Sequence, residues 1–198
     1  MTDVPDFAVP DLIAIGASAG GVDAVGRLLT VLPAHTRAAV VVVLHVPPDR
    51  PSGLAPLFDE RCALPVTEAE DKECLSPGLV YIAPPDYHLL VEPDRSLSLS
   101  VEEAVLFSRP SIDLTFESAA YAYGDRALGI ILTGASSDGA QGLRHIREQG
   151  GVAWVQQPEG ARAQAMPRAA LAQAGADLVG DIDALAAYLA RTLARTQQ

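Results

Sequence analysis

One stretch decides the fold: Ala39-Val40-Val41-Val42-Val43-Leu44, six apolar residues of which four are β-branched. β-branched side chains favour extended backbone, and a strand with no polar alternation is buried on both faces. Helices must therefore cover both sides of the sheet that contains this strand. His45 follows the strand directly, and Pro47-Pro48 is expected to stop it.

Similar short apolar runs lie on both sides of this strand, and segments with helical spacing separate them. Strands are predicted at residues 12–15, 79–83, 128–132, 152–155 and 177–179, with a weaker one from Val66. Helices are predicted at residues 21–32, 52–61, 111–123, 138–149, 166–174 and 182–193, the last capped by Asp181. Residues 88–91 and 97–101 alternate like a hairpin around Pro93-Asp94. The pattern predicts an α/β fold: a doubly wound, mostly parallel sheet with helices on both faces and one antiparallel hairpin insert.

Length and composition exclude several classes of protein. The chain has 198 residues, 49% of them hydrophobic and 20% charged, which is typical of one globular domain. Its net charge of −11 argues against a nucleic-acid binder and against docking on an anionic membrane. No apolar run approaches the roughly 20 residues that span a bilayer, and no signal peptide precedes residue 12. Cys62 and Cys74 match no zinc spacing and no disulfide framework. We expect a cytoplasmic protein with no metal and no cofactor.

In an open parallel sheet, sites form beyond the carboxyl ends of the strands. Ser18 follows the first predicted strand and lies in Gly16-Ala17-Ser18-Ala19-Gly20, which fits the G-x-S-x-G pattern of exposed nucleophilic serines. The free N–H groups of the following helix favour a developing anion, so backbone at Ala19 and Gly20 is a candidate oxyanion site. A generic glycine-rich turn, with the serine used for capping or phosphate binding, fits the pattern equally well.

His45 is the candidate base because it ends the strand that decides the fold. His35 precedes that strand and so lies at the wrong end of the sheet. His145 is expected to face water from its helix, and His88 lies in the hairpin, where it could line a rim. A buried, hydrogen-bonded histidine is the alternative reading of His45.

Asp138 is the candidate acid because it follows the buried strand at residues 128–132. It also precedes a predicted helix, so a plain N-cap aspartate is the alternative. Asp113 is a competitor that ranks lower, since it falls in the first turn of a helix after a loop. The order serine, histidine, aspartate differs from that of the α/β hydrolases, but triads recur by geometry and not by sequence order.

An ordered set of short motifs, running through nearly the whole chain, resembles the catalytic domain of chemotaxis receptor protein-glutamate methylesterases, the CheB family. These motifs are residues 16–21, 44–47, 77–84, 87–89, 109–113, 132–134, 138–140 and 166–170. The resemblance implies hydrolysis of glutamyl methyl esters on chemoreceptor cytoplasmic helices, with release of methanol, and deamidation of particular receptor glutamines. The family's catalytic serine, histidine and aspartate fall on Ser18, His45 and Asp138. We also expect Ala135 to contribute to the oxyanion site, and Arg109 and Met166 to contact the substrate.

Several positions depart from the family pattern. Ala19 stands where the family has threonine, Ala165 replaces a usual glycine, and the residues before Asp138 differ. Typical members also carry an N-terminal receiver domain. We expect residues 1–11 to be a tail and residues 12–195 to form the catalytic domain, with no receiver domain in this chain; a receiver could act as a separate protein.

Two other functions fit the same sequence. One is an esterase of this fold that acts on a different protein or on a small ester, and the other is a catalytically silent signalling or binding module. A nucleotide-binding module fits less well, because the first turn lacks G-x-G-x-x-G and no Walker lysine follows it.

Overall fold

The structure is a computed structural model that describes residues 7–46 and 52–195. The predicted Pro47-Pro48 stop and the first six residues of the predicted tail lie outside these ranges. None of the described helices is both long and apolar enough to cross a bilayer.

The core of the molecule is a seven-stranded sheet in the order β3-β4-β2-β1-β7-β8-β9, in which every neighbouring pair is parallel. The strand that decided the fold, β2, pairs with the central strand β1 from Leu12 opposite Ala39 to Ala17 opposite Leu44. The strand bounds are β1 Leu12–Ala17, β2 Ala39–Leu44, β3 Val66–Glu68, β4 Val80–Ile82, β7 Ala127–Ile131, β8 Val152–Gln156 and β9 Leu178–Gly180.

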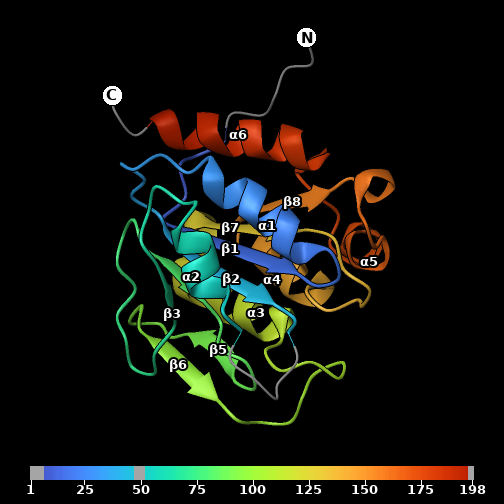
Figure 1. Ribbon diagram of the computed structural model, residues 1–198. Coiled ribbons are helices and arrows are strands. Elements are labelled where there is room, and N and C mark those ends of the chain that lie inside the picture. The colour runs from blue at the N-terminus through green and yellow to red at the C-terminus, as the bar shows by residue number, and fades with distance from the viewer. Residues whose placement is uncertain (1–6, 47–51, 196–198) are drawn as a thin grey trace.

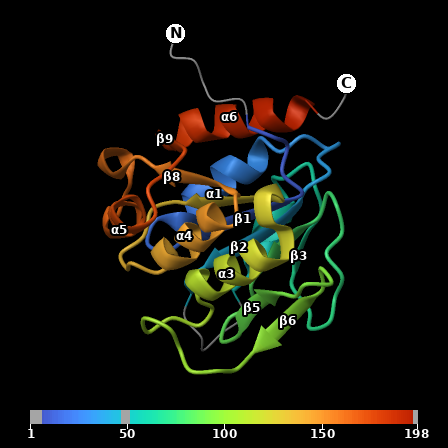
Figure 2. The ribbon, with the colours of Figure 1, turned by 180° about the vertical axis from the view of Figure 1, so that it is seen from behind.

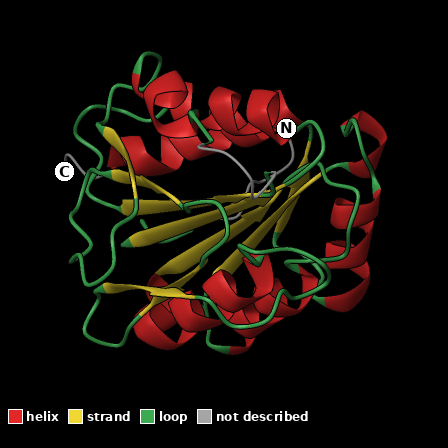
Figure 3. Ribbon diagram, turned by 60° about the horizontal axis from the view of Figure 1, so that its bottom comes forward, coloured by secondary structure: helices red, strands yellow, loops and turns green. Residues whose placement is uncertain are grey.

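Helices cover both faces of this sheet (Figures 1 and 3). Val40 and Val42 point into one apolar cluster, whereas Val41 and Val43 point into the other. The first cluster packs against α1 (Gly21–Thr30), α2 (Leu54–Asp59) and α6 (Ile182–Ala194). The second packs against α3 (Ile112–Tyr123), α4 (Ala140–Glu148) and α5 (Ala165–Gln173). Two short 3₁₀ helices, Gly124–Arg126 and Pro158–Gly160, complete the helices.

The antiparallel hairpin forms a separate layer beyond α3. It consists of β5 (His88–Val91) and β6 (Leu97–Ser100). The hydroxyl of Thr115 donates to the carbonyl of Leu89 at 2.7 Å, and the N–H of Val91 donates to the Ser118 hydroxyl at 3.0 Å. Figures 1 and 2 both show the hairpin on the outer side of α3, away from the sheet.

The predicted α/β fold with one antiparallel insert is therefore confirmed. One boundary differs in a way that matters for the site. Helix α4 begins at Ala140 and not at Asp138, because Gly139 takes up the left-handed φ of 92° at the N-cap. The predicted cap at the last helix is present, since the Asp181 carboxylate accepts the N–H of Ala184 at 2.8 Å.

Candidate active site

The three predicted site residues come from adjacent strands. β1 lies between β2 and β7; Ser18 follows β1, His45 follows β2, and Asp138 lies between β7 and α4. The N–H of His45 donates to the carbonyl of Ala17 at 3.2 Å, which continues the β1–β2 pairing up to the residue before Ser18. The N–H of Ser18 donates to the carbonyl of Thr133, which lies just after β7, at 2.9 Å. The chain reverses its strand order at β1, which is where ligands bind in such sheets.

Ser18 lies on a tight turn between β1 and α1. Gly20 adopts a left-handed φ of 79° at the N-cap of α1, and the N–H of Gly21 donates to the Ser18 carbonyl at 2.7 Å. A Cβ at Gly21 would lie 2.4 Å from the Leu44 side chain, so the turn is also closely packed. Within residues 7–46 and 52–195, the half-buried Ser18 hydroxyl has no hydrogen-bond partner. Among the described residues, the Ser18 hydroxyl therefore has no hydrogen bond to break before it reacts.

His45 and Asp138 form a close pair. His45 Nε2 lies 2.8 Å from Asp138 Oδ2; the imidazole is 12% exposed and the carboxylate is fully buried. An ionised carboxylate only accepts hydrogen bonds, so Nε2 carries the proton and Nδ1 is left with a free lone pair. The nitrogen available as a base is therefore Nδ1.

The Asp138 carboxylate also binds the N-terminus of α3. Oδ2 accepts the N–H of Ile112 at 2.7 Å, and Oδ1 accepts the N–H of Asp113 and the hydroxyl of Ser111, both at 3.0 Å. Helix N-termini favour negative charge, because their first N–H groups have no partner within the helix. The alternative of a plain N-cap for α4 is wrong: Asp138 reaches across to a helix that precedes it in the chain.

These contacts set the charge of Asp138. Burial alone would raise the pKa of this carboxyl group, but the hydrogen bonds from His45 and from the N–H groups of Asp113 and Ile112 outweigh burial. The pKa of Asp138 is therefore lowered, and the group is ionised at neutral pH.

The competing carboxylate, Asp113, has a different environment. Burial raises its pKa and the neighbouring charge of Asp138 adds to that rise, even though Asp113 accepts the N–H of Gly142 at 2.7 Å. It links α3 to α4 and, within the described residues, makes no hydrogen bond or ion pair with His45.

A residue that the sequence analysis missed completes the surroundings of His45. The hydroxyl of Ser108 lies 3.2 Å from His45 Nδ1, on the side of the ring opposite Asp138. The only sequence signal was its position, directly before the Arg109-Pro110-Ser111 motif.

The site opens into a pocket of about 690 Å³. Ser18, His45, Ser108 and Ala135 all line it. The N–H of Gly134 is used by the carbonyl of Ala163 at 3.0 Å, but the N–H groups of Ala19, Gly20 and Ala135 have no acceptor in the described parts of the chain. Of these three residues, Ala135 lines the pocket, and Ala19 and Gly20 directly follow Ser18.

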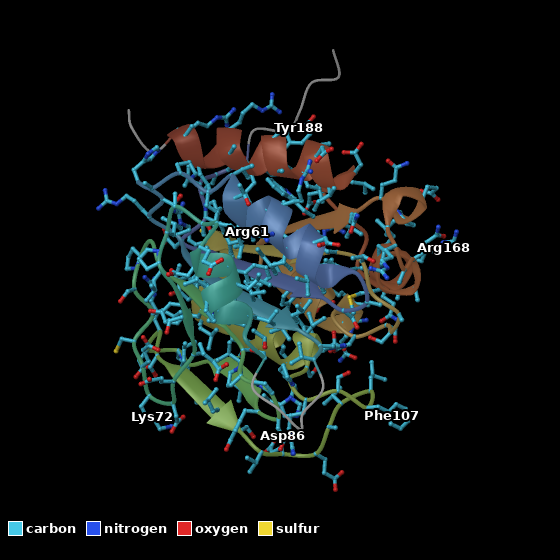
Figure 4. The ribbon with its side chains drawn as sticks, viewed as in Figure 1. Arg61, Lys72, Asp86, Phe107, Arg168 and Tyr188 are labelled. Atoms are coloured by element: carbon cyan, nitrogen blue, oxygen red, sulfur yellow. The ribbon has the colours of Figure 1, made fainter. Side chains whose placement is uncertain are left out.

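Arg109 lines the same pocket, and four of its five guanidinium N–H donors are already used. Its guanidinium donates to the Asp86 carboxylate at 2.6 and 3.0 Å and to the carbonyls of Val101 and Glu102, both at 2.9 Å. Arg109 therefore fixes the loop beside the pocket. The loop's most exposed side chain, Phe107, extends into solvent (Figure 4).

The predicted substrate contact of Met166 is not supported. Met166 has no exposed surface and packs beneath Gly134, where an added Cβ would lie 2.6 Å from the methionine side chain. Its N–H donates to the Gly134 carbonyl at 3.0 Å. Met166 therefore packs against the loop that carries Ala135 and does not reach a ligand in the pocket.

Two of the other histidines, His88 and His145, are placed differently from their predictions. His88 is fully buried and does not line a rim: its Nδ1 accepts the N–H of Ser111 at 3.1 Å, and Nε2 therefore donates to the carbonyl of Glu103 at 3.1 Å. The side chain of His145 is only 19% exposed and lies 3.7 Å from the Glu117 carboxylate, so it does not simply face water.

Comparison with known proteins points to one family. The family model described as CheB methylesterase matches residues 13–189. The chain belongs to this family. The crystal structure of the Thermotoga maritima CheB methylesterase catalytic domain superposes with a TM-score of 0.87 at 31% sequence identity, and the match covers 93% of this chain and 99% of that one. The predicted family and fold are both confirmed.

Two curated relatives differ in how much of their length this chain spans. A Leptospira interrogans protein named "Putative protein-glutamate methylesterase/protein-glutamine glutaminase" is 43% identical over 181 residues, which are 91% of this chain and 94% of the relative. The protein-glutamate methylesterase/protein-glutamine glutaminase 1 of Oleidesulfovibrio alaskensis is 40% identical over 90% of this chain but only 49% of its own length. This chain thus spans nearly all of one CheB relative and about half of the other.

Proposed function

We propose that this protein is a cytoplasmic serine hydrolase that demethylates glutamyl methyl esters on chemoreceptor cytoplasmic helices, releases methanol, and also deamidates receptor glutamines. The single observation that carries the proposal is the His45–Asp138 pair, joined at 2.8 Å and opening on the pocket that Ser18 lines. Family membership supports the substrate class, since the curated relatives are named for both reactions. Residues 12–195 act as one catalytic domain in this proposal.

The first half of the reaction forms an ester between enzyme and substrate. His45 Nδ1 takes the proton of the Ser18 hydroxyl as Ser18 Oγ attacks the ester carbonyl. The tetrahedral intermediate collapses, the bond to methoxide breaks, and His45 returns the proton so that methanol leaves. Asp138 keeps the proton on Nε2 and stabilises the imidazolium that forms in between.

The second half reverses these roles with water. His45 Nδ1 takes a proton from water, hydroxide attacks the glutamyl ester of Ser18, and the proton passes to Ser18 as glutamate is released. In both halves, negative charge develops on the carbonyl oxygen of the substrate. The N–H groups of Ala19, Gly20 and Ala135 are proposed to hold that charge, aided by the N-terminus of α1.

The test is methanol release from a methylated receptor fragment, compared with hydrolysis of a panel of simple esters. Ser18→Ala serves as the control for non-enzymatic hydrolysis. The proposal expects the receptor fragment to be the preferred substrate and the control to be inactive. Hydrolysis of simple esters without release of methanol from the fragment would show the same chemistry on a different ester. No hydrolysis of either would favour a silent binding module.

A further inference from the structure

One ring nitrogen of His45 can accept a hydrogen bond, and Ser18 and Ser108 both line the same pocket as this ring. Asp138 accepts the proton on Nε2, so Nδ1 is the only ring nitrogen that can accept. Ser108 Oγ already lies 3.2 Å from Nδ1 and donates to it. Ser18 needs the same nitrogen when it loses its proton. In the free enzyme, therefore, the imidazole is held from both sides, and the hydroxyl on the pocket side is that of Ser108.

The position of Ser108 is built into a tight turn. The backbone of Val105 and Ser108 pairs in both directions, at 3.1 and 2.8 Å, and the two residues between them have left-handed φ values of 48° and 65°. These two residues are Leu106 and Phe107. Their backbone is strained, since residues other than glycine rarely adopt a left-handed φ. Strained turns of this kind persist where the surroundings hold them, and they gather at functional sites.

The surroundings do hold this turn. Arg109 binds the carbonyls of Val101 and Glu102 at 2.9 Å, and the buried His88 donates to the carbonyl of Glu103 at 3.1 Å. Three successive carbonyls at the start of the loop are thus fixed. The hydroxyl of Ser108 has no other partner among the described residues, so its contact with His45 is not a by-product of another bond.

We propose that Ser108 is a positioning residue: its hydroxyl holds the His45 ring with Nδ1 facing the pocket until Ser18, with the ester bound, takes over that nitrogen. The inference rests on the proposed function for the role of Ser18. A ring hydrogen-bonded at both nitrogens is fixed in rotation, whereas a ring bound only to Asp138 can pivot about that one bond. Orientation of a base is worth much of its rate advantage, because proton transfer requires a short and aligned contact.

Ser108 could instead be read as the nucleophile, because Ser108, His45 and Asp138 form a continuous hydrogen-bonded row. The surroundings argue against that reading. The N–H groups of Ser18 and Ser108 are both used by carbonyls, but Ser18 precedes the N-terminus of α1 and has the unused N–H groups of Ala19 and Gly20 beside it. Among the described residues, a helix N-terminus that favours a developing oxyanion follows Ser18, whereas Ser108 lies in a hairpin turn.

The test compares Ser108→Ala with Ser108→Thr, which keeps a hydroxyl at the same place. Two rates are measured for each enzyme: hydrolysis of p-nitrophenyl acetate, and phosphonylation of Ser18 by a fluorophosphonate. Ser108→Ala should lower kcat and the phosphonylation rate about three- to tenfold, which is the loss expected for one hydrogen bond, and should leave KM within about twofold. Ser108→Thr should restore most of both rates.

A spectroscopic readout separates positioning from a general loss of fold. In ¹⁵N NMR of the imidazole, the His45 Nδ1 resonance should move when Ser108→Ala removes its donor and should return in Ser108→Thr. Unchanged or faster rates in Ser108→Ala, or an Nδ1 resonance that does not move, would overturn the inference. So would loss of all labelling at Ser18, because Ser108 would then be more than a positioning residue. If the unaltered enzyme reacts with neither reagent, the proposed function fails, and the NMR result alone decides whether Ser108 holds the ring.

Discussion

The two halves of the site are built in opposite ways. On the carboxylate side, Asp138 is fully buried and its two oxygens accept four hydrogen bonds, three of them from the first residues of α3 and its N-cap. On the hydroxyl side, Ser18 and Ser108 are only half-buried, Ser18 Oγ has no described partner, and Ser108 Oγ has one. The difference indicates a base held in a fixed frame and a nucleophile left free to move toward its substrate.

The largest expected effect lies on the hydroxyl side. Ser18→Ala should reduce ester hydrolysis by about 10⁴- to 10⁶-fold, as the loss of a triad nucleophile does elsewhere. The melting temperature should barely change, because the Ser18 hydroxyl has no described hydrogen bond to lose. Hydrolysis rates and a thermal melt of the same sample check both statements. Activity within about tenfold of the unaltered enzyme would remove Ser18 from the mechanism.

The carboxylate side should show a loss of activity together with a loss of stability. Asp138→Asn should reduce turnover by about 10⁴-fold, because an amide no longer holds the proton on Nε2 of His45. It should also lower the free energy of unfolding by about 1–3 kcal/mol, because the amide NH₂ faces groups that need an acceptor. Turnover and urea unfolding measure the two effects.

Asp113→Asn is the matched control for that variant. Asp113 is close to Asp138 and also accepts a backbone N–H, but it does not contact His45. Its turnover should stay within about tenfold of the unaltered enzyme. If both variants lost activity equally, the contrast between the two carboxylates would fail.

The charge of Asp138 predicts how stability depends on pH. Its folded-state pKa is lowered, so its ionised form stabilises the fold above the ordinary aspartate pKa of about 4, and this contribution is lost as the pH falls through the lower folded-state pKa. Urea unfolding of the unaltered protein and of Asp138→Asn should therefore differ at pH 6 and converge as the pH approaches 3. The comparison with Asp138→Asn is needed because Asp113, whose pKa is raised, contributes with the opposite sign. A gap that widened toward acid would contradict the assignment.

The smallest effect is expected at Ser111, which joins the N-terminus of α3 to Asp138. Ser111 caps α3 by accepting the N–H of Leu114 and donates to Asp138 Oδ1. Ser111→Ala should lower the free energy of unfolding by about 1–2 kcal/mol, as the loss of a helix cap does, and should reduce turnover less than tenfold. Chemical unfolding and steady-state kinetics measure these changes. A turnover loss as large as that of Asp138→Asn would mean that Asp138 cannot orient His45 without Ser111.

The sequence was most informative where the answer depended on strand order and burial. Four consecutive valines predicted a strand covered on both faces, and the carboxyl-end rule predicted that Ser18, His45 and Asp138 meet at one edge of the sheet. That rule works because neighbouring parallel strands lie about 4.8 Å apart, so residues that directly follow paired strands are close in space.

The sequence was least informative where contacts join distant segments. A cap for the following helix stayed open as the alternative role of Asp138, because local sequence cannot show that the N-terminus of α3 points at the same carboxylate. Ser108 was missed for the same reason: its contact with His45 spans 63 residues and depends on the course of a loop. Met166 was expected at the ligand, yet the packing of Gly134 onto it requires that it be buried.

One measurement tests the central claim most directly: labelling with a fluorophosphonate, followed by trypsin digestion and mass spectrometry. Ser18 is the only serine in the N-terminal fragment that ends at Arg27, whereas Ser108 lies in a fragment that begins after Arg95. The account predicts a single adduct on the N-terminal fragment, and no adduct in Ser18→Ala. An adduct on the fragment that contains Ser108, or no adduct on the unaltered protein, would contradict it.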